Sequence, residues 1–410
     1  MAEDLLFLAH RIPYPPDKGD KIRSFHLLAG LARRYRVHVG AFIDDPEDAA
    51  HAADLRQYCA SVYMPRLHPL LGDLRGLPRT VRGAPLSLAR YTHGAFARWV
   101  GETLRRQRIR RVFAFSAAVG RYGLHPTPWS TARIMDFVDV DSEKWRQYAA
   151  RERGPLRAVY VREHHTLERA EAALAAAYDA SLFVSAEESR LFLARHRELD
   201  GKVHAIPNGV DGGYFDPGAS HPRPFAQGVR AAVFTGAMDY QANVDGVVWF
   251  CREVWPAVRA ARADARLYIV GRRPSSAVRA LTRLDGVEVT GRVPDVRPYL
   301  AHAKVAVAPL RVARGIQNKV LEALAMGRPV VGSAAAWEGL GPFDPLFGAR
   351  EDAPEDFARA VIRHLDAPNG EGEARRAAIL ARFSWERAVE RCQELLESTV
   401  AQKLPLEAAP

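Results

Sequence analysis

Short apolar segments alternate with longer helical segments through almost the whole of this 410-residue chain. Near-continuous apolar strands between helices are typical of parallel sheets that are covered on both faces. Because the pattern runs through twice, it predicts an α/β protein with two Rossmann-like domains. The expected strands are 5–9, 37–43, 62–64, 111–116, 133–138, 180–185, 231–236, 266–271, 287–291, 305–310 and 329–333. The expected helices are 22–34, 47–58, 86–107, 156–178, 187–195, 243–262, 275–283, 296–302, 316–326 and 354–366.

The chain is longer than one typical hydrophobic core supports, which also favours two domains. Residues 206–228 contain five glycines and four prolines and cannot continue a helix or a strand. We therefore expect domains at 1–205 and 229–384, joined by a linker at 206–228. Residues 385–398 predict a last amphipathic helix, and residues 400–410 a disordered tail.

Composition indicates a globular protein of the cytoplasm. Hydrophobic residues make up 48% of the chain and charged residues 26%. No apolar run approaches the roughly 18–20 residues that span a membrane, and acidic residues stand near the N-terminus where a signal peptide is positive. The three cysteines are far apart and offer neither a disulfide framework nor metal-ligand spacing.

Much of the formal charge of +10 is concentrated in residues 75–111, which hold ten arginines and one acid, Glu102. Such a stretch suits a nucleic acid, an anionic membrane, an anionic substrate or simply a solvated face. Phe96, Trp99 and Leu104 are interleaved with the arginines, which favours a membrane surface. No nucleic-acid module is recognisable, so we expect no nucleic-acid partner. A peripheral position at the inner membrane face is the resulting hypothesis.

Residues 314–340, RGIQNKVLEALAMGRPVVGSAAAWEGL, predict a glycine turn, a helix, a Gly-Arg-Pro stop and a buried strand. A helix start with free amides and a positive dipole end is a ready site for an anion. Lys319 in the first turn opposes the dipole unless a negative ligand is also there, and Glu322 lies on the same face. A phosphate-binding lysine and a hydroxyl-binding carboxylate suit a sugar nucleotide. The alternative is an ordinary amphipathic helix with an exposed Lys–Glu pair.

Residues 315–331, GIQNKVLEALAMGRPVV, resemble the C-terminal donor-binding motif of the retaining glycosyltransferases of family 4. The resemblance runs from about residue 5 to about residue 398, and the most similar subgroup is the sugar transferases associated with bacterial exopolysaccharide loci. It implies the GT-B fold, with the parallel sheets of two Rossmann-like domains facing a central cleft. The acceptor would bind to 1–205 and the nucleotide sugar to 229–384. Helix 385–398 would pack back onto the N-terminal domain.

The resemblance also implies which residues bind the donor. Members often place an arginine and a lysine near 238–242, where this chain has Asp239 and Gln241. Phosphate neutralisation would then depend on Lys319, with Arg272 or Arg273. Arg314 stands where members often carry a second glutamate. The donor-binding residues so implied are Gly19, Gly236, Arg272, Gly291, Arg292, Val293, Gly315, Ile316, Gln317, Asn318 and Glu322.

Two aspartates, Asp139 and Asp141, follow the expected strand 133–138. Family members often carry a histidine near this point that contacts the donor sugar, and this chain has none. Either aspartate could accept hydrogen bonds from sugar or acceptor hydroxyls, or Asp141 or Ser142 could cap the following helix. Lys319, Asp139 and Asp141 are the catalytic candidates.

The loop after the first strand is rich in proline and carries Lys18, Lys21 and Arg23 at the start of a helix. Open α/β sheets bind ligands at the carboxyl ends of their strands, so these three residues are the candidates for acceptor binding. A plain basic loop is the alternative. His164 and His165 have no further ligand spacing, so we expect them to pack rather than to bind a metal.

The resulting prediction is a hexosyltransferase that moves a sugar, with retention, from a nucleotide-diphosphate sugar to a saccharide or polyprenyl-linked acceptor in polysaccharide biosynthesis. It would use no metal and no cofactor besides its donor. A sugar-nucleotide epimerase of the same architecture and a non-catalytic nucleotide-sugar binding module are the alternatives. A Rossmann dehydrogenase is disfavoured, because the chain lacks a well-placed G-x-G-x-x-G.

Overall fold

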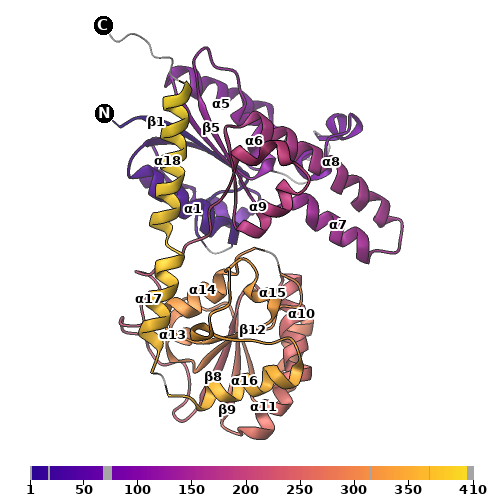
Figure 1. The fold of residues 1–410 in the computed structure, drawn as a ribbon, viewed down its shortest axis with the longest axis vertical. Helices are drawn as coiled ribbons and strands as arrows, with labels where there is room; N and C mark the ends of the chain where they lie inside the picture. Colours follow the sequence, from indigo (N-terminus) through magenta and orange to yellow (C-terminus); the bar gives the residue numbers. More distant parts are fainter. Residues whose placement is uncertain (1, 17–18, 68–75, 314, 369, 404–410) are drawn as a thin grey trace. The chain divides into compact units, whose positions relative to one another are not determined.

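The computed structural model of the protein describes residues 2–16, 19–67, 76–313, 315–368 and 370–403. The chain forms two compact units, each built around one parallel sheet (Figure 1). The N-terminal unit contains Met1–Pro207 together with Trp385–Pro410, and the C-terminal unit is Asn208–Ser384. None of the described helices is long and apolar enough to cross a lipid bilayer.

The N-terminal unit has a seven-stranded sheet in the order β3-β2-β1-β4-β5-β6-β7. Every pair of neighbouring strands is parallel, as the apolar pattern predicted. The strand order reverses between β1 and β4, so the segments that leave these two strands diverge. The strands are β1 (Asp4–Ala9), β2 (Arg36–Ala41), β3 (Ser61–Tyr63), β4 (Arg111–Phe115), β5 (Ala132–Val138), β6 (Ala180–Phe183) and β7 (Val203–Ala205).

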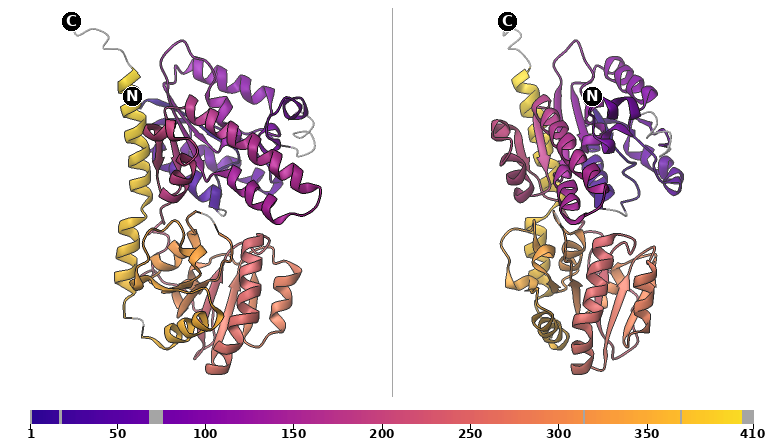
Figure 2. Two further views of the ribbon diagram at one scale, coloured as in Figure 1. Left: turned by 45° about the vertical axis from the view of Figure 1, so that its right-hand side comes forward. Right: turned by 90° about the vertical axis from the view of Figure 1, so that its right-hand side faces the viewer.

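Helices cover both faces of this sheet, and α7 and α8 lie side by side (Figure 2). The α-helices are α1 (Gly19–Ala32), α2 (Ala52–Leu55), α4 (Leu86–Ala89), α5 (Gly94–Arg106), α6 (Ala117–Gly123), α7 (Asp141–Arg151), α8 (Leu156–Ala177), α9 (Ala186–Leu193) and α18 (Trp385–Lys403). The 3-10 segments are η1 (Pro46–His51), η2 (Arg56–Tyr58) and η3 (Arg197–Lys202).

The C-terminal helix α18 belongs to the core of the N-terminal unit. Its buried positions recur at helical spacing, so one face of the helix is apolar. That face joins the cluster formed by β1, β2 and α1, and a Cβ added at Gly30 would lie 2.3 Å from Cγ2 of Val389. The helix continues to Lys403, beyond the expected end at 398. The remainder of the expected tail, residues 404–410, lies outside the described residues.

The C-terminal unit has a six-stranded parallel sheet in the order β10-β9-β8-β11-β12-β13. Its strands are β8 (Arg230–Thr235), β9 (Ala265–Val270), β10 (Val287–Gly291), β11 (Val305–Ala308), β12 (Val330–Gly332) and β13 (Gly348–Arg350). Its helical segments are α10 (Gln241–Trp249), η4 (Phe250–Val254), α11 (Trp255–Ala261), α12 (Ser276–Ala280), η5 (Leu281–Arg283), α13 (Arg297–His302), α14 (Asn318–Ala325), α15 (Ala334–Trp337), η6 (Pro345–Phe347), α16 (Pro354–Asp366) and α17 (Gly372–Arg382).

Several expected helices are interrupted. The helix expected at 243–262 contains a π-helical turn, η4, directly before α11. Pro256 explains this turn, because it has no N–H to donate to the carbonyl four residues earlier. The helix expected at 86–107 is two helices, α4 and α5, and the one expected at 47–58 is made of three short pieces.

Candidate functional site

The strand order of the C-terminal unit reverses between β8 and β11, and open α/β sheets bind ligands at such a point. Gly236 directly follows β8 and leads into α10. The segment after β11 leads through Gly315 into α14. The two segments predicted to hold a donor therefore leave neighbouring strands at the same edge of one sheet.

Two glycines allow the loops at this edge to approach one another closely. Gly236 has a φ of 155°, and a Cβ at this position would lie 2.7 Å from Nδ2 of Asn243 and 3.2 Å from Nζ of Lys319. A Cβ on Gly271 would lie 1.6 Å from the carbonyl oxygen of Gly236. Any larger residue at either position would push the loops apart, so both glycines are required by the packing.

Lys319 lies in the first turn of α14, with Nζ 2.5 Å from Oδ1 of Asn243 and 4.4 Å from the ring centre of Phe234. Within the described part of the chain, no carboxylate forms an ion pair with this ammonium group. Burial lowers the pKa of Lys319 to about 7, and the nearby Glu322 opposes that shift. The surroundings thus hold the amine in place without a described ionic partner, and a bound anion would favour its charged form.

Glu322 lies three residues after Lys319 on α14. Burial raises the pKa of Glu322 to about 7, and the charge of Lys319 opposes the shift. A half-buried carboxylate at this place can accept hydrogen bonds from the hydroxyl groups of a ligand.

The start of α14 has no side-chain cap. Its N-cap residue, Gln317, is extended and makes no capping hydrogen bond with its side chain. The helix begins at Asn318, two residues later than expected, so Ile316 and Gln317 belong to the turn. Gly315 in that turn has a φ of 63°, a conformation that favours glycine. An uncapped helix start beside Lys319 matches the predicted anion site.

The other expected donor-binding residues share this edge of the sheet. Gly236 N–H donates to the carbonyl of Val270 at 3.0 Å, and Gly271 N–H donates to that of Gly291 at 3.1 Å. Arg292 and Val293 follow Gly291 in the chain. These backbone bonds hold together the loops that follow β8, β9 and β10.

Charged side chains in these loops depart from the family pattern. Asp239, which stands in place of a base, lies 3.9 Å from the guanidinium of Arg273. The carbonyl oxygen of Arg272 accepts a hydrogen bond from Met238 N–H at 2.9 Å. Arg314, which stands where family members often carry a second glutamate, lies outside the described residues.

Asn243 lies within α10 and holds two neighbouring loops together. Helix α10 begins at Gln241 after Tyr240, so Asn243 is inside its first turn. Its Nδ2 donates to the carbonyl of Ala237 at 2.8 Å, and its Oδ1 accepts from Lys319. The sequence interpretation missed this positioning role, because the partner of Asn243 is 76 residues away in the chain.

The acceptor-binding hypothesis for Lys21 and Arg23 is wrong for their side chains. Both lie on α1 and are buried, with relative exposures of 1% and 0%. Nζ of Lys21 is 2.6 Å from Asp48, and Nε of Arg23 is 2.8 Å from Asp136. Their charges hold the fold together and are not presented to a ligand. Gly19 begins α1, and Lys18 lies outside the described residues.

Asp139 and Asp141 both pair with Lys144, at 3.2 Å and 2.7 Å. Burial opposes a charge on Lys144, but the two aspartates raise the pKa of Lys144 well above its usual value. Neither Asp141 nor Ser142 caps α7, because Val140 is the N-cap residue. Val138 just before them has a φ of 70°, which is rare for a β-branched residue and marks a strained turn.

His10, which directly follows β1, was not among the site residues predicted from the sequence. The ring of His10 stacks over Phe115 at 6.0 Å between centres, and Nε2 is 3.3 Å from Asp20. Arg11 links the same Asp20 to Asp44, at 2.7 Å and 2.6 Å. The only signal in the sequence is a histidine and an aspartate on either side of a proline-rich loop.

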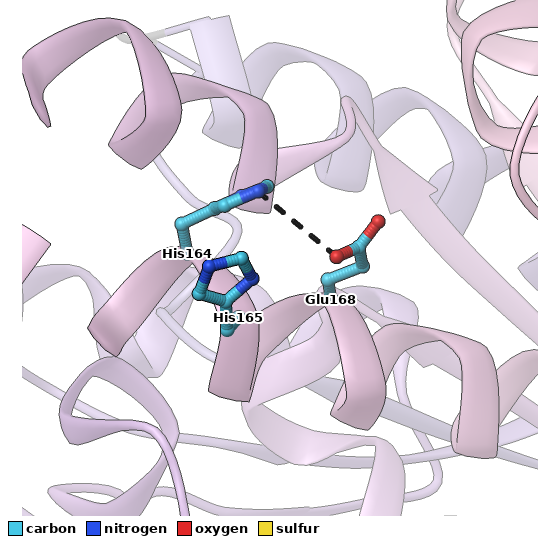
Figure 3. A group of neighbouring side chains, drawn as sticks. All are labelled: His164, His165 and Glu168. Carbon is cyan, nitrogen blue, oxygen red and sulfur yellow. Dashed lines mark ion pairs between the residues drawn. The ribbon is translucent and has the colours of Figure 1, made fainter. Parts of the chain in front are cut away.

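Three side chains on α8, His164, His165 and Glu168, have potential metal-ligand atoms within 4.8 Å of one another (Figure 3). Two of them already have partners. Nδ1 of His164 lies 2.9 Å from the carbonyl of Ser142, and Glu168 lies 3.3 Å from Arg195. The arginine competes for the only carboxylate of the group, so these contacts favour a packing role.

The three apolar residues that favoured a membrane surface in the stretch 75–111 pack within the N-terminal unit. Phe96 and Leu104 on α5 point into the core with 0% exposure, and Trp99 stacks on Tyr63 at 5.4 Å. These three side chains are therefore unavailable to a membrane. Residues 75 and 68–74 lie outside the described part of the chain.

One family model matches the part of the chain that contains most of the candidate site. Residues 230–367, which contain most of the site above, match the family model described as "Glycosyl transferases group 1". No curated protein matches the sequence.

Solved structures establish the GT-B fold. HepE from Anabaena in complex with UDP is 14% identical and has a TM-score of 0.68, with 96% of this chain and 100% of that chain covered. Sucrose-phosphate synthase from Thermosynechococcus elongatus is 19% identical, with a TM-score of 0.68 and coverage of 98% and 100%. WaaG, a glycosyltransferase involved in lipopolysaccharide biosynthesis, is 15% identical, with a TM-score of 0.61 and coverage of 96% and 99%.

Proposed function

We propose that this protein is a glycosyltransferase that takes its sugar from a nucleotide-diphosphate sugar bound in the C-terminal unit. The observation that carries the proposal is the ammonium group of Lys319, which is held by Asn243 at the uncapped start of α14 and forms no ion pair with a described carboxylate. The match of residues 230–367 to glycosyl transferases group 1 supports the same reaction class. HepE structures described with UDP and with UDP-glucose make uridine donors the first to test.

The diphosphate of the donor would lie between Lys319 and the amides at the start of α14. As the bond to the sugar breaks, positive charge spreads over the sugar ring and negative charge builds on the departing diphosphate. Lys319 and the helix dipole would stabilise that negative charge. Glu322 would accept hydrogen bonds from the ribose hydroxyls and so orient the nucleotide. Loops containing Gly236 and Gly291 would allow the donor to approach the backbone.

Retention of configuration is part of the proposal and rests on the resemblance of residues 315–331 to retaining family 4 enzymes. The departing diphosphate can take the proton of the attacking hydroxyl, so no protein nucleophile is needed. Asp139 and Asp141 are the candidate contacts to sugar or acceptor hydroxyls, with Lys144 fixing their positions. In this scheme the charge of the donor is met by Lys319 and the helix rather than by a metal.

The acceptor that we propose is a saccharide on a lipid carrier at an anionic membrane surface. Exposed apolar residues occur on α8 and on and after the helical residues 76–81 of the N-terminal unit. These two elements are neighbours, because Arg162 of α8 donates to the carbonyl of Thr80 at 2.8 Å. The exposed apolar side chains there are Leu77, Val81, Leu86, Leu156 and Val159. Arg153 and Arg157 lie beside Leu156 in the sequence, which suits anionic lipid headgroups.

A non-catalytic nucleotide-sugar binding module is the second candidate. It is favoured by one observation, the replacement of the usual basic pair by Asp239 and Gln241. Such a module would keep the Lys319 and Glu322 site and bind a donor without turnover.

The test uses NMR to monitor the slow hydrolysis of UDP-, GDP-, ADP- and dTDP-sugars by the protein in the absence of an acceptor. We expect one nucleotide class to release free sugar, first seen as the anomer of the donor. Lys319→Met should remove this activity. Lys304→Met is the matched control, because Lys304 precedes β11 and so lies at the opposite edge of the sheet. Binding without any product would favour the module, and an epimerised nucleotide sugar would favour the epimerase.

A further inference from the structure

A basic pocket lies in the N-terminal unit, with a volume of about 420 Å³. It is formed around the start of α5 and the end of α6. Two arginines and two histidines, Arg79, Arg121, His93 and His125, supply its charged and titratable groups, and none of its described lining residues is acidic. A pocket with such a lining has an excess of positive charge with no internal counterion.

Arg121 is held rigidly at this pocket. One of its terminal nitrogens donates to the carbonyl of Tyr91 at 3.1 Å and to the hydroxyl of Tyr122 at 2.6 Å. The guanidinium also lies over the ring of Tyr122, 4.5 Å from its centre. Its Nε is buried and has no acceptor among the described residues. This donor leaves part of the charge of Arg121 unsatisfied by the protein, which favours an anion in the pocket beside the guanidinium group.

Arg79 adds a second guanidinium from the helical residues 76–81. Burial and the charge of Arg121 together lower the pKa of Arg79. The two cations therefore repel one another across the pocket, and a multiply charged anion between them would replace this repulsion with attraction.

Helix α5 directs its N-terminus to the same place. Its 13 residues begin at Gly94, which lines the pocket, and a Cβ added there would meet no atom within 4 Å. The space beside the first residue of the helix is therefore open. Nδ1 of His93 already accepts from Phe96 N–H at 3.1 Å, so the helix adds the positive end of its dipole to the two guanidinium groups rather than an uncapped start.

We propose that this pocket binds a phosphate group, as a phosphate monoester or a diphosphate. Two guanidinium groups and a helix N-terminus suit the several oxygens and the charge of phosphate better than a single carboxylate. The phosphate could belong to a lipid headgroup or to a soluble molecule, and the chemistry of recognition is shared. This site is in the N-terminal unit and is additional to the proposed donor site, so it does not depend on the transfer reaction.

The test is calorimetric titration of the full chain with inorganic pyrophosphate in a Lys319→Met background, which removes the proposed donor site. We expect saturable binding that Arg79→Gln weakens by about tenfold, the loss typical of one charge-assisted hydrogen bond. Arg82→Gln is the matched control, because it removes the same charge three residues later outside the pocket. It should leave the affinity unchanged, and Arg121→Lys should weaken binding although the charge is kept.

A second arm identifies the source of the phosphate. Flotation with vesicles of phosphatidylcholine, with and without phosphatidic acid, is compared for the same variants. A loss of binding to phosphatidic acid in Arg79→Gln but not in Arg82→Gln would identify a lipid headgroup, and pyrophosphate binding without that difference would identify a soluble ligand. Absence of saturable pyrophosphate binding, or equal losses in the Arg79 and Arg82 variants, would overturn the proposal. Thermal unfolding of each variant checks that its fold is intact.

Discussion

Nζ of Lys319 lies 2.5 Å from Oδ1 of Asn243, and this hydrogen bond joins α14, which follows β11, to α10, which follows β8. It therefore spans the point where the strand order of the C-terminal sheet reverses. An amide oxygen fixes the position of the ammonium group but leaves its charge available. The site is thus organised before any ligand arrives, which lowers the entropic cost of binding.

Converting Asn243 to aspartate should weaken donor binding more than removing its side chain does. Asn243→Asp gives Lys319 an anionic partner and places a negative charge beside the diphosphate, so we expect a loss of about a hundredfold. Asn243→Ala only frees the lysine, so we expect about tenfold. Calorimetric titration with the preferred donor measures both. Equal affinities of the two variants would contradict the proposed position of the diphosphate.

Donor binding should be strongest near pH 7. Burial lowers the pKa of Lys319 to about 7, so the ammonium group that attracts the diphosphate is lost as pH rises above that value. Burial raises the pKa of Glu322 to about 7, so the carboxylate that accepts ribose hydroxyls is lost as pH falls. Each limb can change the affinity by at most about tenfold per pH unit.

Variants separate the two limbs of that profile. Lys319→Arg keeps its charge at all accessible pH values, so it should abolish the fall at high pH. Glu322→Gln should abolish the fall at low pH. Dissociation constants measured from about pH 5.5 to 9 give the result, and a wild-type affinity that does not change with pH would count against both assignments.

Removing Arg23 should destabilise the N-terminal unit rather than alter ligand binding. Arg23→Met leaves Asp136 buried without its partner, and we expect a loss of about 3–5 kcal/mol in the free energy of unfolding. Arg23→Met combined with Asp136→Leu should recover most of that loss. Urea unfolding measures both, with Arg33→Met, an exposed site just after α1, as the control. A loss below about 1 kcal/mol would mean that the pair is not buried as described.

Glu171 should make the stability of the protein depend on pH. It accepts hydrogen bonds from Ser142 N–H at 3.1 Å and from the hydroxyl at 2.6 Å, yet burial and Asp141 raise the pKa of Glu171 to about 8. Between about pH 4.5 and 8 the folded state holds a proton that the unfolded state has lost. The free energy of unfolding therefore falls as pH rises through this window, by at most about 1.4 kcal/mol per unit.

Glu171→Gln removes this dependence. The variant should unfold at a higher temperature than the wild type near pH 8.5 and at a similar temperature near pH 5. A difference of the same size at both pH values would show that Glu171 is ionised throughout the range.

The exposed apolar side chains near residue 80 should contribute to membrane binding. Leu77→Ser combined with Val81→Ser should reduce flotation with vesicles that contain anionic lipid, since apolar burial and charge act together at such a surface. Leu284→Ser in the C-terminal unit is the control. Neutralising Arg105, Arg106 and Arg108 on and after α5 tests the charge alone. Unchanged flotation in all variants would contradict the proposed binding to an anionic membrane surface.

Local patterns predicted the α/β layers and the helix with Lys319 and Glu322, because strand and helix periodicity and the Gly-Arg-Pro stop are encoded within a few residues. Pairings between distant residues could not be predicted in this way. Arg23 pairs with Asp136, which lies 113 residues later in the chain. Lys319 is hydrogen-bonded to Asn243, which lies 76 residues earlier. The first pairing makes an expected ligand contact a buried ion pair, and the second supports the candidate site from a residue that no local pattern indicated as part of it. Strands β7 and β13 were not expected, because their sequences, Val-His-Ala and Gly-Ala-Arg, contain no apolar run.

The most direct measurement is calorimetric titration of nucleotide-diphosphate sugars into the wild type, Lys319→Met and Lys304→Met at pH 7. We expect one nucleotide class to bind to the wild type and to Lys304→Met with the same affinity, and Lys319→Met to weaken this binding by at least about tenfold. Donor binding that is unchanged in Lys319→Met would contradict the assignment of the site at the start of α14.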